Sequence, residues 1–157
     1  MTTVSISQSA ILNLDLSPIA TDLDRWLVDK NPTQFNLDIK LAIDYPLEPQ
    51  DPRELSEIPE VRLWFIRVDA CYPQLPLILD WQAGELARYV AMLVPHQFSR
   101  KDGIQYNPEA LEIWVMHRVF LLTAWLDAQQ IKDRSRLKFM TQMLGYELDD
   151  GLFDLLK

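Results

Sequence analysis

The sequence predicts an α+β protein that has a small mixed or antiparallel sheet and a helical C-terminal part. Two segments support this prediction. Residues 35–43 alternate large apolar and polar side chains, which is the period of a half-buried strand. Residues 108–130 contain an apolar run of helical length. With 157 residues, 48% of them hydrophobic, the chain can bury one core, so a single domain over residues 1–157 is expected.

The segment 108–130 is predicted to be a central, buried helix. Asn107 is a good N-cap, Pro108 suits the first helical position, and Glu109 places negative charge near the positive end of the helix dipole. Few polar residues interrupt the apolar run, so other elements should cover the helix on nearly all sides. The charges in its first half argue against a membrane span. Three aromatic residues are expected to be core anchors: Trp114, Phe120 and Trp125.

The elements before this helix are predicted from the spacing of apolar residues and from the residues that begin and end helices. Residues 2–7 alternate as in a short half-buried strand. A helix over 17–31 is opened by Ser-Pro and ended by Asn-Pro. The strand at 35–43 follows, with one wet face. Residues 61–70 are apolar on both faces for most of their length, which predicts an interior strand.

The C-terminal elements follow in the same way. Asp80 is predicted to cap a helix that Val-Pro stops at residue 94, and residues 104–106 are a candidate edge strand. After the central helix, a helix over 135–144 should end at Gly145, before a last amphipathic turn. The resulting order is compatible with a ferredoxin-like βαββαβ unit followed by a helical part.

Residues 46–60, PLEPQDPRELSEIPE, are called the acidic arm below. They hold four of the ten prolines, and both prolines and carboxylates recur every third residue, which in a polyproline II helix places like residues along one ridge. A capping box from Asp51 to Glu54 predicts instead one helical turn over 52–57. The arm is either a covering loop or a stiff docking surface for a basic partner, because a stiff segment loses little entropy on binding.

Composition argues against several functions. The net charge is −8, and residues 1–60 hold 11 acidic and 4 basic residues, whereas residues 61–157 hold 12 and 11. Such a surface repels phosphate backbones, so no nucleic-acid partner is expected. Cys71 is the only cysteine, and the N-terminus MTTVSISQS lacks the features of a signal peptide. A cytoplasmic protein that is not embedded in a membrane is therefore expected.

The sequence also lacks the residues that usually bind a cofactor. The four glycines lie far apart and form no phosphate-binding loop, and one cysteine with two histidines cannot provide a zinc or iron–sulfur site, so no cofactor is expected. The strongest catalytic candidates are carboxylates near apolar segments. Burial of Asp69 could raise its pKa toward the range of a general acid, and Asp80 could act with it. A small carboxylate-dependent enzyme using Asp69 and Asp80 is therefore the alternative hypothesis.

Four stretches carry a family resemblance: DPRELSEIPEVRLWFIRVDA (51–70), DWQAGELARYVAMLVPHQF (80–98), GIQYNPEALEIWV (103–115) and GYELDD (145–150). Through them the chain resembles the chlororespiratory reduction six family of cyanobacteria and chloroplasts. The resemblance covers residues 43–157, and the first two stretches are its most specific parts.

The resemblance implies a non-catalytic, chaperone-like assembly factor for the photosynthetic NAD(P)H dehydrogenase-like complex. Such a factor would bind and mature the ferredoxin-type iron–sulfur subunit of the hydrophilic arm, in the cyanobacterial cytoplasm or, for plastid relatives, in the stroma. No catalytic residue, cofactor or metal ligand follows from the resemblance. Our candidates for partner contact are Arg53, Glu54, Glu57, Trp81 and Arg88.

Overall fold

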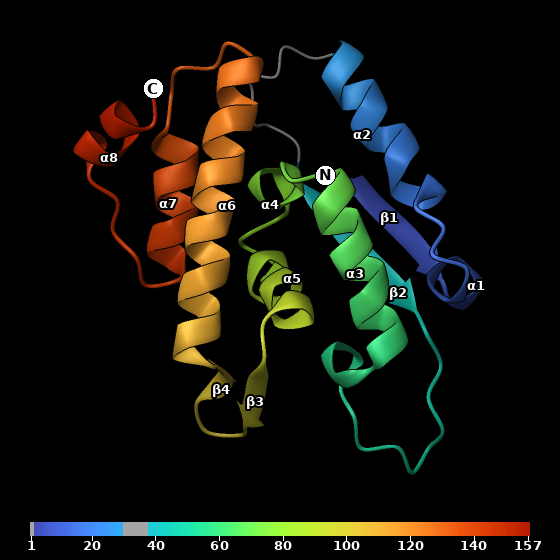
Figure 1. The fold of residues 1–157 in the computed structure, drawn as a ribbon. Helices are drawn as coiled ribbons and strands as arrows, with labels where there is room; N and C mark the ends of the chain where they lie inside the picture. The colour runs from blue at the N-terminus through green and yellow to red at the C-terminus, as the bar shows by residue number, and fades with distance from the viewer. Residues whose placement is uncertain (1, 30–37) are drawn as a thin grey trace. The chain divides into compact units, whose positions relative to one another are not determined.

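The computed structural model describes residues 2–29 and 38–157, and the chain forms two compact units, Met1–Leu93 and Val94–Lys157 (Figure 1). Each unit combines helices with a two-stranded sheet, so the predicted α+β class is confirmed. The units are called unit 1 and unit 2 and are described separately. That they fold as one domain stays a prediction.

The sheet of unit 1 pairs β1 (Thr2–Ser7) with β2 (Ile39–Asp44) in parallel, from Thr2 opposite Ile39 to Ser7 opposite Asp44. Alternation buries Val4 and Ile6 of β1, as the sequence predicts. The strand predicted at 35–43 is present as β2, although its first three residues, 35–37, lie outside the described part of the chain. Its buried residue Ile39 also forms a parallel bridge to Leu79.

Helices make up most of the rest of unit 1: α1 (Gln8–Leu12), α2 (Ser17–Asp29), the 3-10 turn η1 (Leu55–Glu57), α3 (Pro59–Cys71), α4 (Leu75–Ile78) and α5 (Glu85–Leu93). The predicted start of α2 is confirmed, and Asp15 supports it by accepting hydrogen bonds from the backbone N–H and the hydroxyl of Ser17. The predicted Asn-Pro stop lies outside the described residues. The short helices α1 and α4 have no predicted counterpart.

The strand predicted at 61–70 is wrong, because this segment lies in helix α3. Its buried side chains are spaced by three and four residues, as on one helical face: Val61, Trp64, Phe65 and Val68. The opposite face exposes Leu63 and Ile66, each at 51%. These two exposed apolar residues make the segment resemble a strand that is buried on both sides.

This helix also removes the third strand of a ferredoxin-like unit. Within the described residues, the strands form two separate two-stranded sheets rather than one four-stranded sheet. The second sheet belongs to unit 2, where β3 (His96–Ser99) and β4 (Gly103–Tyr106) form an antiparallel hairpin. The predicted edge strand at 104–106 is confirmed as β4, whereas β3 has no predicted counterpart.

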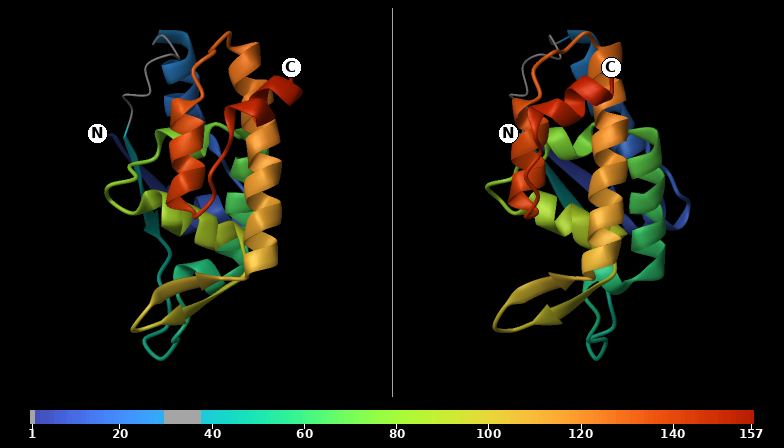
Figure 2. Two further views of the ribbon diagram at one scale, coloured as in Figure 1. Left: turned by 90° about the vertical axis from the view of Figure 1, so that its left-hand side faces the viewer. Right: turned by 60° about the vertical axis from the view of Figure 1, so that its left-hand side comes forward.

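The helices of unit 2 are α6 (Pro108–Ala128), α7 (Ser135–Met143) and α8 (Asp150–Leu155). Helices α6 and α7 contact each other and run side by side in opposite directions (Figures 1 and 2). The predicted end of α7 is confirmed, and Gly145 just after it has a φ of 93°, a left-handed conformation that favours glycine.

The start and the cap of α6 are confirmed, since the Asn107 side chain accepts a hydrogen bond from the N–H of Ala110 at 3.0 Å, and the helix ends at Ala128, two residues before the predicted end. Its surroundings differ from the prediction. Only one face is buried, and Ile113 is 71% and Phe120 47% exposed, so the expectation of cover on nearly all sides is wrong. Phe120 is no core anchor, and Trp114 and Trp125 are half-buried. An apolar sequence fixes the helix but does not reveal what lies beside it.

Candidate functional site

The five candidate contact residues all belong to unit 1 and fall into two groups. Arg53, Glu54 and Glu57 lie in the acidic arm, which forms a loop between β2 and α3 in Figure 1. Trp81 and Arg88 lie just before and within α5. The two groups are connected because η1, the turn at the end of the arm, packs against α5 as well as α3.

Arg53 is fixed at the start of the second half of the arm. Its backbone N–H donates to the Asp51 carboxylate at 3.0 Å, and its guanidinium donates to the same carboxylate through Nε (3.0 and 3.1 Å) and Nη2 (2.7 Å). The side-chain hydrogen bond from Arg53 is the largest cause that lowers the pKa of Asp51, and the same bond to Asp51 is the largest cause that raises the pKa of Arg53. The residue predicted to cap a helix thus binds Arg53 instead.

Glu54 and Glu57 form the capping box of the arm, three residues later than predicted. The Glu57 carboxylate accepts a hydrogen bond from the backbone N–H of Glu54 at 2.6 Å, and η1 begins at Leu55. Ile58 follows with an extended backbone before Pro59, as expected for a residue that precedes proline. Both carboxylates remain exposed.

The acidic arm is not one continuous polyproline ridge. A turn interrupts it, with the N–H of Asp51 donating to the carbonyl of Glu48 at 2.9 Å. The regular spacing of its carboxylates therefore does not place them on a single line. The arm is nevertheless held by local bonds at Asp51 and Glu57, and its carboxylates Glu48, Glu54 and Glu60 are exposed.

Arg88 has a definite structural contact. Its Nη1 donates to the backbone carbonyl of Leu41 at 3.0 Å and to the Glu85 carboxylate at 3.3 Å. Glu85, which is 8% exposed, accepts in turn from the N–H of Leu41 at 3.4 Å. Because Thr2 of β1 binds the carbonyl of Asp38, alternation directs the polar groups of Leu41 to the other edge of β2. The two side chains therefore satisfy both backbone groups of Leu41 on that edge.

Trp81 lies one residue after Asp80, in the turns that lead into α5. Its indole N–H donates to the carbonyl of Pro76 at 2.8 Å, which leaves the half-buried ring at the surface of unit 1. The backbone N–H of Asp80 donates to the carbonyl of Ile39 at 2.9 Å. Trp81 thus directly follows Leu79 and Asp80, whose backbone pairs with Ile39 at the edge of β2.

Asp69 and Asp80, the two carboxylates of the alternative enzyme hypothesis, both form contacts within unit 1. Asp69 is 7% exposed and accepts a hydrogen bond from the hydroxyl of Tyr89 at 2.8 Å, which links α3 to α5. Asp80 accepts from the N–H of Ala83 at 3.0 Å and lies 4.0 Å from the Lys40 ammonium. Asp80 therefore does not cap the helix as predicted. It caps a turn that precedes α5, because the helix begins only at Glu85.

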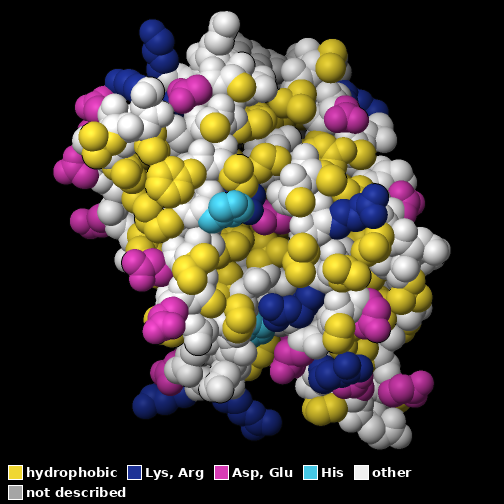
Figure 3. Space-filling model, in the orientation of Figure 1, with side chains coloured by type: hydrophobic (Ala, Val, Ile, Leu, Met, Phe, Trp, Pro, Cys, Tyr) yellow, Lys and Arg dark blue, Asp and Glu magenta, His cyan; other side chains and the backbone are white. Residues whose placement is uncertain are grey.

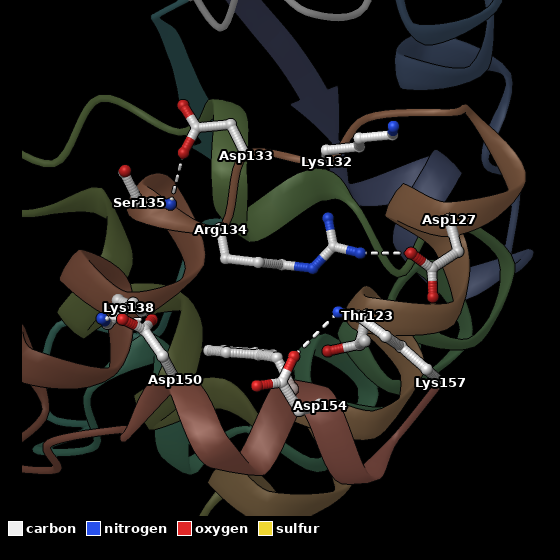
Figure 4. A pocket seen from close by; sticks show the side chains of 11 residues that line it. Thr123, Asp127, Lys132, Asp133, Arg134, Ser135, Lys138, Asp150, Asp154 and Lys157 are labelled. Atoms are coloured by element: carbon white, nitrogen blue, oxygen red, sulfur yellow. Dashed lines mark hydrogen bonds and ion pairs between the residues drawn. The ribbon is translucent and has the colours of Figure 1, made fainter.

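A hollow of about 720 Å³ lies in unit 2, and sequence reasoning did not predict it (Figure 4). It is lined by residues of α6, α7, α8 and the intervening loops, with four basic and four acidic side chains. Arg134 and Asp127 point toward each other as an ion pair, and Lys138 pairs with Asp150 at 2.8 Å. Two of the four basic residues in the stretch 132–138, Arg134 and Lys138, are thus neutralised by aspartates from α6 and α8.

The hollow contains one buried group that lacks a partner. Thr123 of α6 lines it, is 4% exposed, and has a hydroxyl that forms no hydrogen bond within the described structure. On another wall, the hydroxyl and the backbone N–H of Ser135 lower the pKa of Asp133. Neither Asp69 nor Asp80 lines this hollow, so the two features are independent.

Within residues 2–29 and 38–157, no three His, Cys, Asp or Glu side chains gather closely enough to hold a metal ion. No helix in the same ranges has the length and hydropathy needed to cross a bilayer.

These features define an α+β protein whose candidate site is a fixed acidic arm beside a sealed sheet edge. The model of the family described as Chlororespiratory reduction 6 matches residues 6–155, so the chain belongs to that family. The family is linked to chlororespiratory reduction, through assembly of the NAD(P)H dehydrogenase-like complex. No solved structure matches the chain.

Proposed function

We propose that this protein is a non-catalytic, chaperone-like assembly factor that binds and matures the ferredoxin-type iron–sulfur subunit of the photosynthetic NAD(P)H dehydrogenase-like complex. Family membership supports the link to this complex. The structural observation that carries the proposal is the fixed acidic arm, with Arg53 bound to Asp51 and Glu54 joined to Glu57. We place its action in the cyanobacterial cytoplasm, or in the plastid stroma for plastid relatives.

Unit 1 carries more excess negative charge than unit 2, so it is the better candidate to bind a basic surface of the iron–sulfur subunit. Residues 1–93 hold 14 acidic and 7 basic residues, whereas residues 94–157 hold 9 and 8. A field of one sign accelerates encounter with a surface of the opposite sign, and the effect weakens as salt increases. Since local hydrogen bonds already order the arm, binding costs little additional conformational entropy.

The candidate contact residues have different roles in this proposal. Glu54 and Glu57 supply exposed negative charge, while Arg53 keeps the arm in place through Asp51. Trp81 offers a half-buried ring of the kind that anchors protein interfaces. Arg88 contributes mainly by holding the edge of β2 beneath them, because its guanidinium is bound to Leu41 and Glu85.

The test measures binding of the purified iron–sulfur subunit at two salt concentrations. The variant carries Glu54→Gln and Glu57→Gln, since glutamine also supports a capping box and therefore preserves the turn. The matched control carries Asp24→Asn and Asp44→Asn, two exposed acids of unit 1 outside the arm. We expect the arm variant to bind more weakly, with a smaller salt dependence, and the control to bind as the wild type does.

Salt-insensitive binding that is equal in both variants would contradict the role of the arm. Failure of the wild-type chain to bind the subunit at all would contradict the proposed client. No observation favours the carboxylate enzyme as a second function, because Asp69 and Asp80 are engaged in contacts within unit 1.

A further inference from the structure

Helix α6 exposes apolar side chains on the face opposite its buried one. The buried residues include Val115, Val119 and Leu122, whereas Ile113 and Phe120 lie on the other side of the helix, at 71% and 47% exposure. Positions 113, 117, 120 and 124 share this face by helical spacing, and none of them is Lys, Arg, Asp or Glu. Between Glu109 and Asp127, which bound it at its two ends, this face of the helix therefore carries no acidic, lysine or arginine side chain.

Helix α7 continues the exposed apolar surface beside α6. Phe139 and Met143 are one helical turn apart and are 55% and 47% exposed. The two helices are antiparallel neighbours, and Figure 3 shows apolar side chains gathered over α7 and the adjoining part of α6. The side chains Ile113, Phe120, Phe139 and Met143 are called the apolar face below. Contiguous exposed apolar surface of this kind marks sites of interaction with other macromolecules.

Charges at one end of the apolar face indicate its partner. Where α6 begins and α7 ends, Glu109, Glu112 and Glu147 are exposed, and none of the three forms an ion pair or a hydrogen bond through its side chain within the described residues. The segments 103–117 and 139–147 contain no Lys or Arg. The negative charge of this end therefore rests mainly on Glu109 and Glu112, because Glu147 lines a small hollow together with Lys138.

We propose that the apolar face seats an amphipathic helix of a partner polypeptide, with its apolar stripe on Phe120 and Phe139 and its basic residues over Glu109, Glu112 and Glu147. Two parallel ridges of side chains from antiparallel helices form a surface on which a third helix packs. This inference rests on the proposed function only in assuming that the protein binds other polypeptides. It assigns a second contact surface, in unit 2, with a chemistry different from that of the acidic arm.

The probe is a synthetic amphipathic peptide that has leucine on one face and lysine on the other, together with a matched peptide in which glutamate replaces lysine. Binding to the full chain is measured by fluorescence anisotropy at low salt. We expect the lysine peptide to bind at least about tenfold more tightly than the glutamate peptide, and Ile113→Ser with Phe120→Ser to weaken it by about tenfold or more. Glu109→Gln with Glu112→Gln should reduce the preference for lysine.

The matched control is Val28→Ser, which removes an apolar side chain that is 83% exposed on α2, outside the apolar face. It should bind the lysine peptide as the wild type does. The inference is overturned if neither peptide binds, if both bind equally, or if the control loses as much affinity as the Ile113 and Phe120 variant. Self-association of the wild type that this variant abolishes would also overturn it, because a second copy would then be the occupant.

Binding of the iron–sulfur subunit to the same variants separates this inference from the proposed function. If the wild type binds the subunit but the peptides fail, the apolar face is refuted and the proposed function stands. If the lysine peptide binds as expected but the wild type does not bind the subunit, the proposed client is wrong and the apolar face stands.

Discussion

The guanidinium of Arg88 donates a hydrogen bond to the backbone carbonyl of Leu41 at 3.0 Å, across 47 positions of the sequence. With Glu85 accepting from the N–H of the same residue, side chains satisfy the backbone groups of Leu41, next to the backbone bridge between Ile39 and Leu79. Unpaired strand edges invite association with other chains. The Arg88 contact therefore protects the sheet of unit 1 while it positions α5 beside it.

Replacing Arg88 with alanine should destabilise the protein by about 1.5–3 kcal/mol, because a carbonyl and the nearly buried Glu85 carboxylate lose a charged donor. Urea unfolding followed by circular dichroism measures this change. Arg25→Ala is the matched control, since Arg25 is exposed and lies 4.0 Å from Asp22; its effect should stay below about 0.5 kcal/mol. Equal effects of the two substitutions would show that the bond to Leu41 is energetically unimportant.

Arg53→Ala should raise the pKa of Asp51 toward its ordinary value, because the side-chain hydrogen bond from Arg53 is the largest cause that lowers it. With a lowered pKa in the folded state, the Asp51 contact stabilises the arm above pH 3.8 and is lost as the pH falls through the folded-state pKa. NMR titration of the carboxyl carbons measures this shift. Asp15 is an internal control, since its lowered pKa depends on Ser17 and should not change.

The hydroxyl of Tyr106 should ionise well above the ordinary pKa of 10.0 for tyrosine, because burial raises its pKa to about 12. The unfolded chain loses this proton near pH 10 and the folded chain does not, so this group's contribution to stability falls as the pH rises from 10 to 12. Tyr106→Phe should remove about 1 kcal/mol of this alkaline loss, after allowance for solvent screening. Absorbance titration of tyrosinate checks it, with Tyr146→Phe as the control that retains the late step.

Local signals predicted those parts of the fold that depend on neighbouring residues. The Asn107 cap and the following proline predicted the start of α6, and the alternation of β1 predicted which side chains it buries. The segment 61–70 also carried a helical signal, since Pro59 and Glu60 suit a first turn. The apolar residues Leu63 and Ile66 obscure the helical spacing of the buried residues. Their exposure depends on what packs around the helix.

The candidate site was predictable only in part, for the same reason. Charge and proline spacing identified the acidic arm, but the turn at Glu48 and the pairing of Asp51 with Arg53 depend on the conformation that the chain adopts. The contact of Arg88 with Leu41 joins distant residues, and no local pattern encodes it. The sequence also does not predict the exposed face of α6, because a continuous apolar run does not show which side of the helix packs against other elements.

The anchoring of α8 to the rest of unit 2 should depend on one side chain. Phe153 is 8% exposed, whereas Leu155 on the same short helix is 84% exposed. Phe153→Ala should destabilise the protein by about 2–4 kcal/mol, and Leu155→Ala, the matched control, should change stability by less than about 0.5 kcal/mol. Urea unfolding measures both, and hydrogen exchange of residues 150–155 reports whether α8 detaches. If exchange is unchanged in Phe153→Ala, the ion pair between Lys138 and Asp150 at 2.8 Å holds the helix without the aromatic ring.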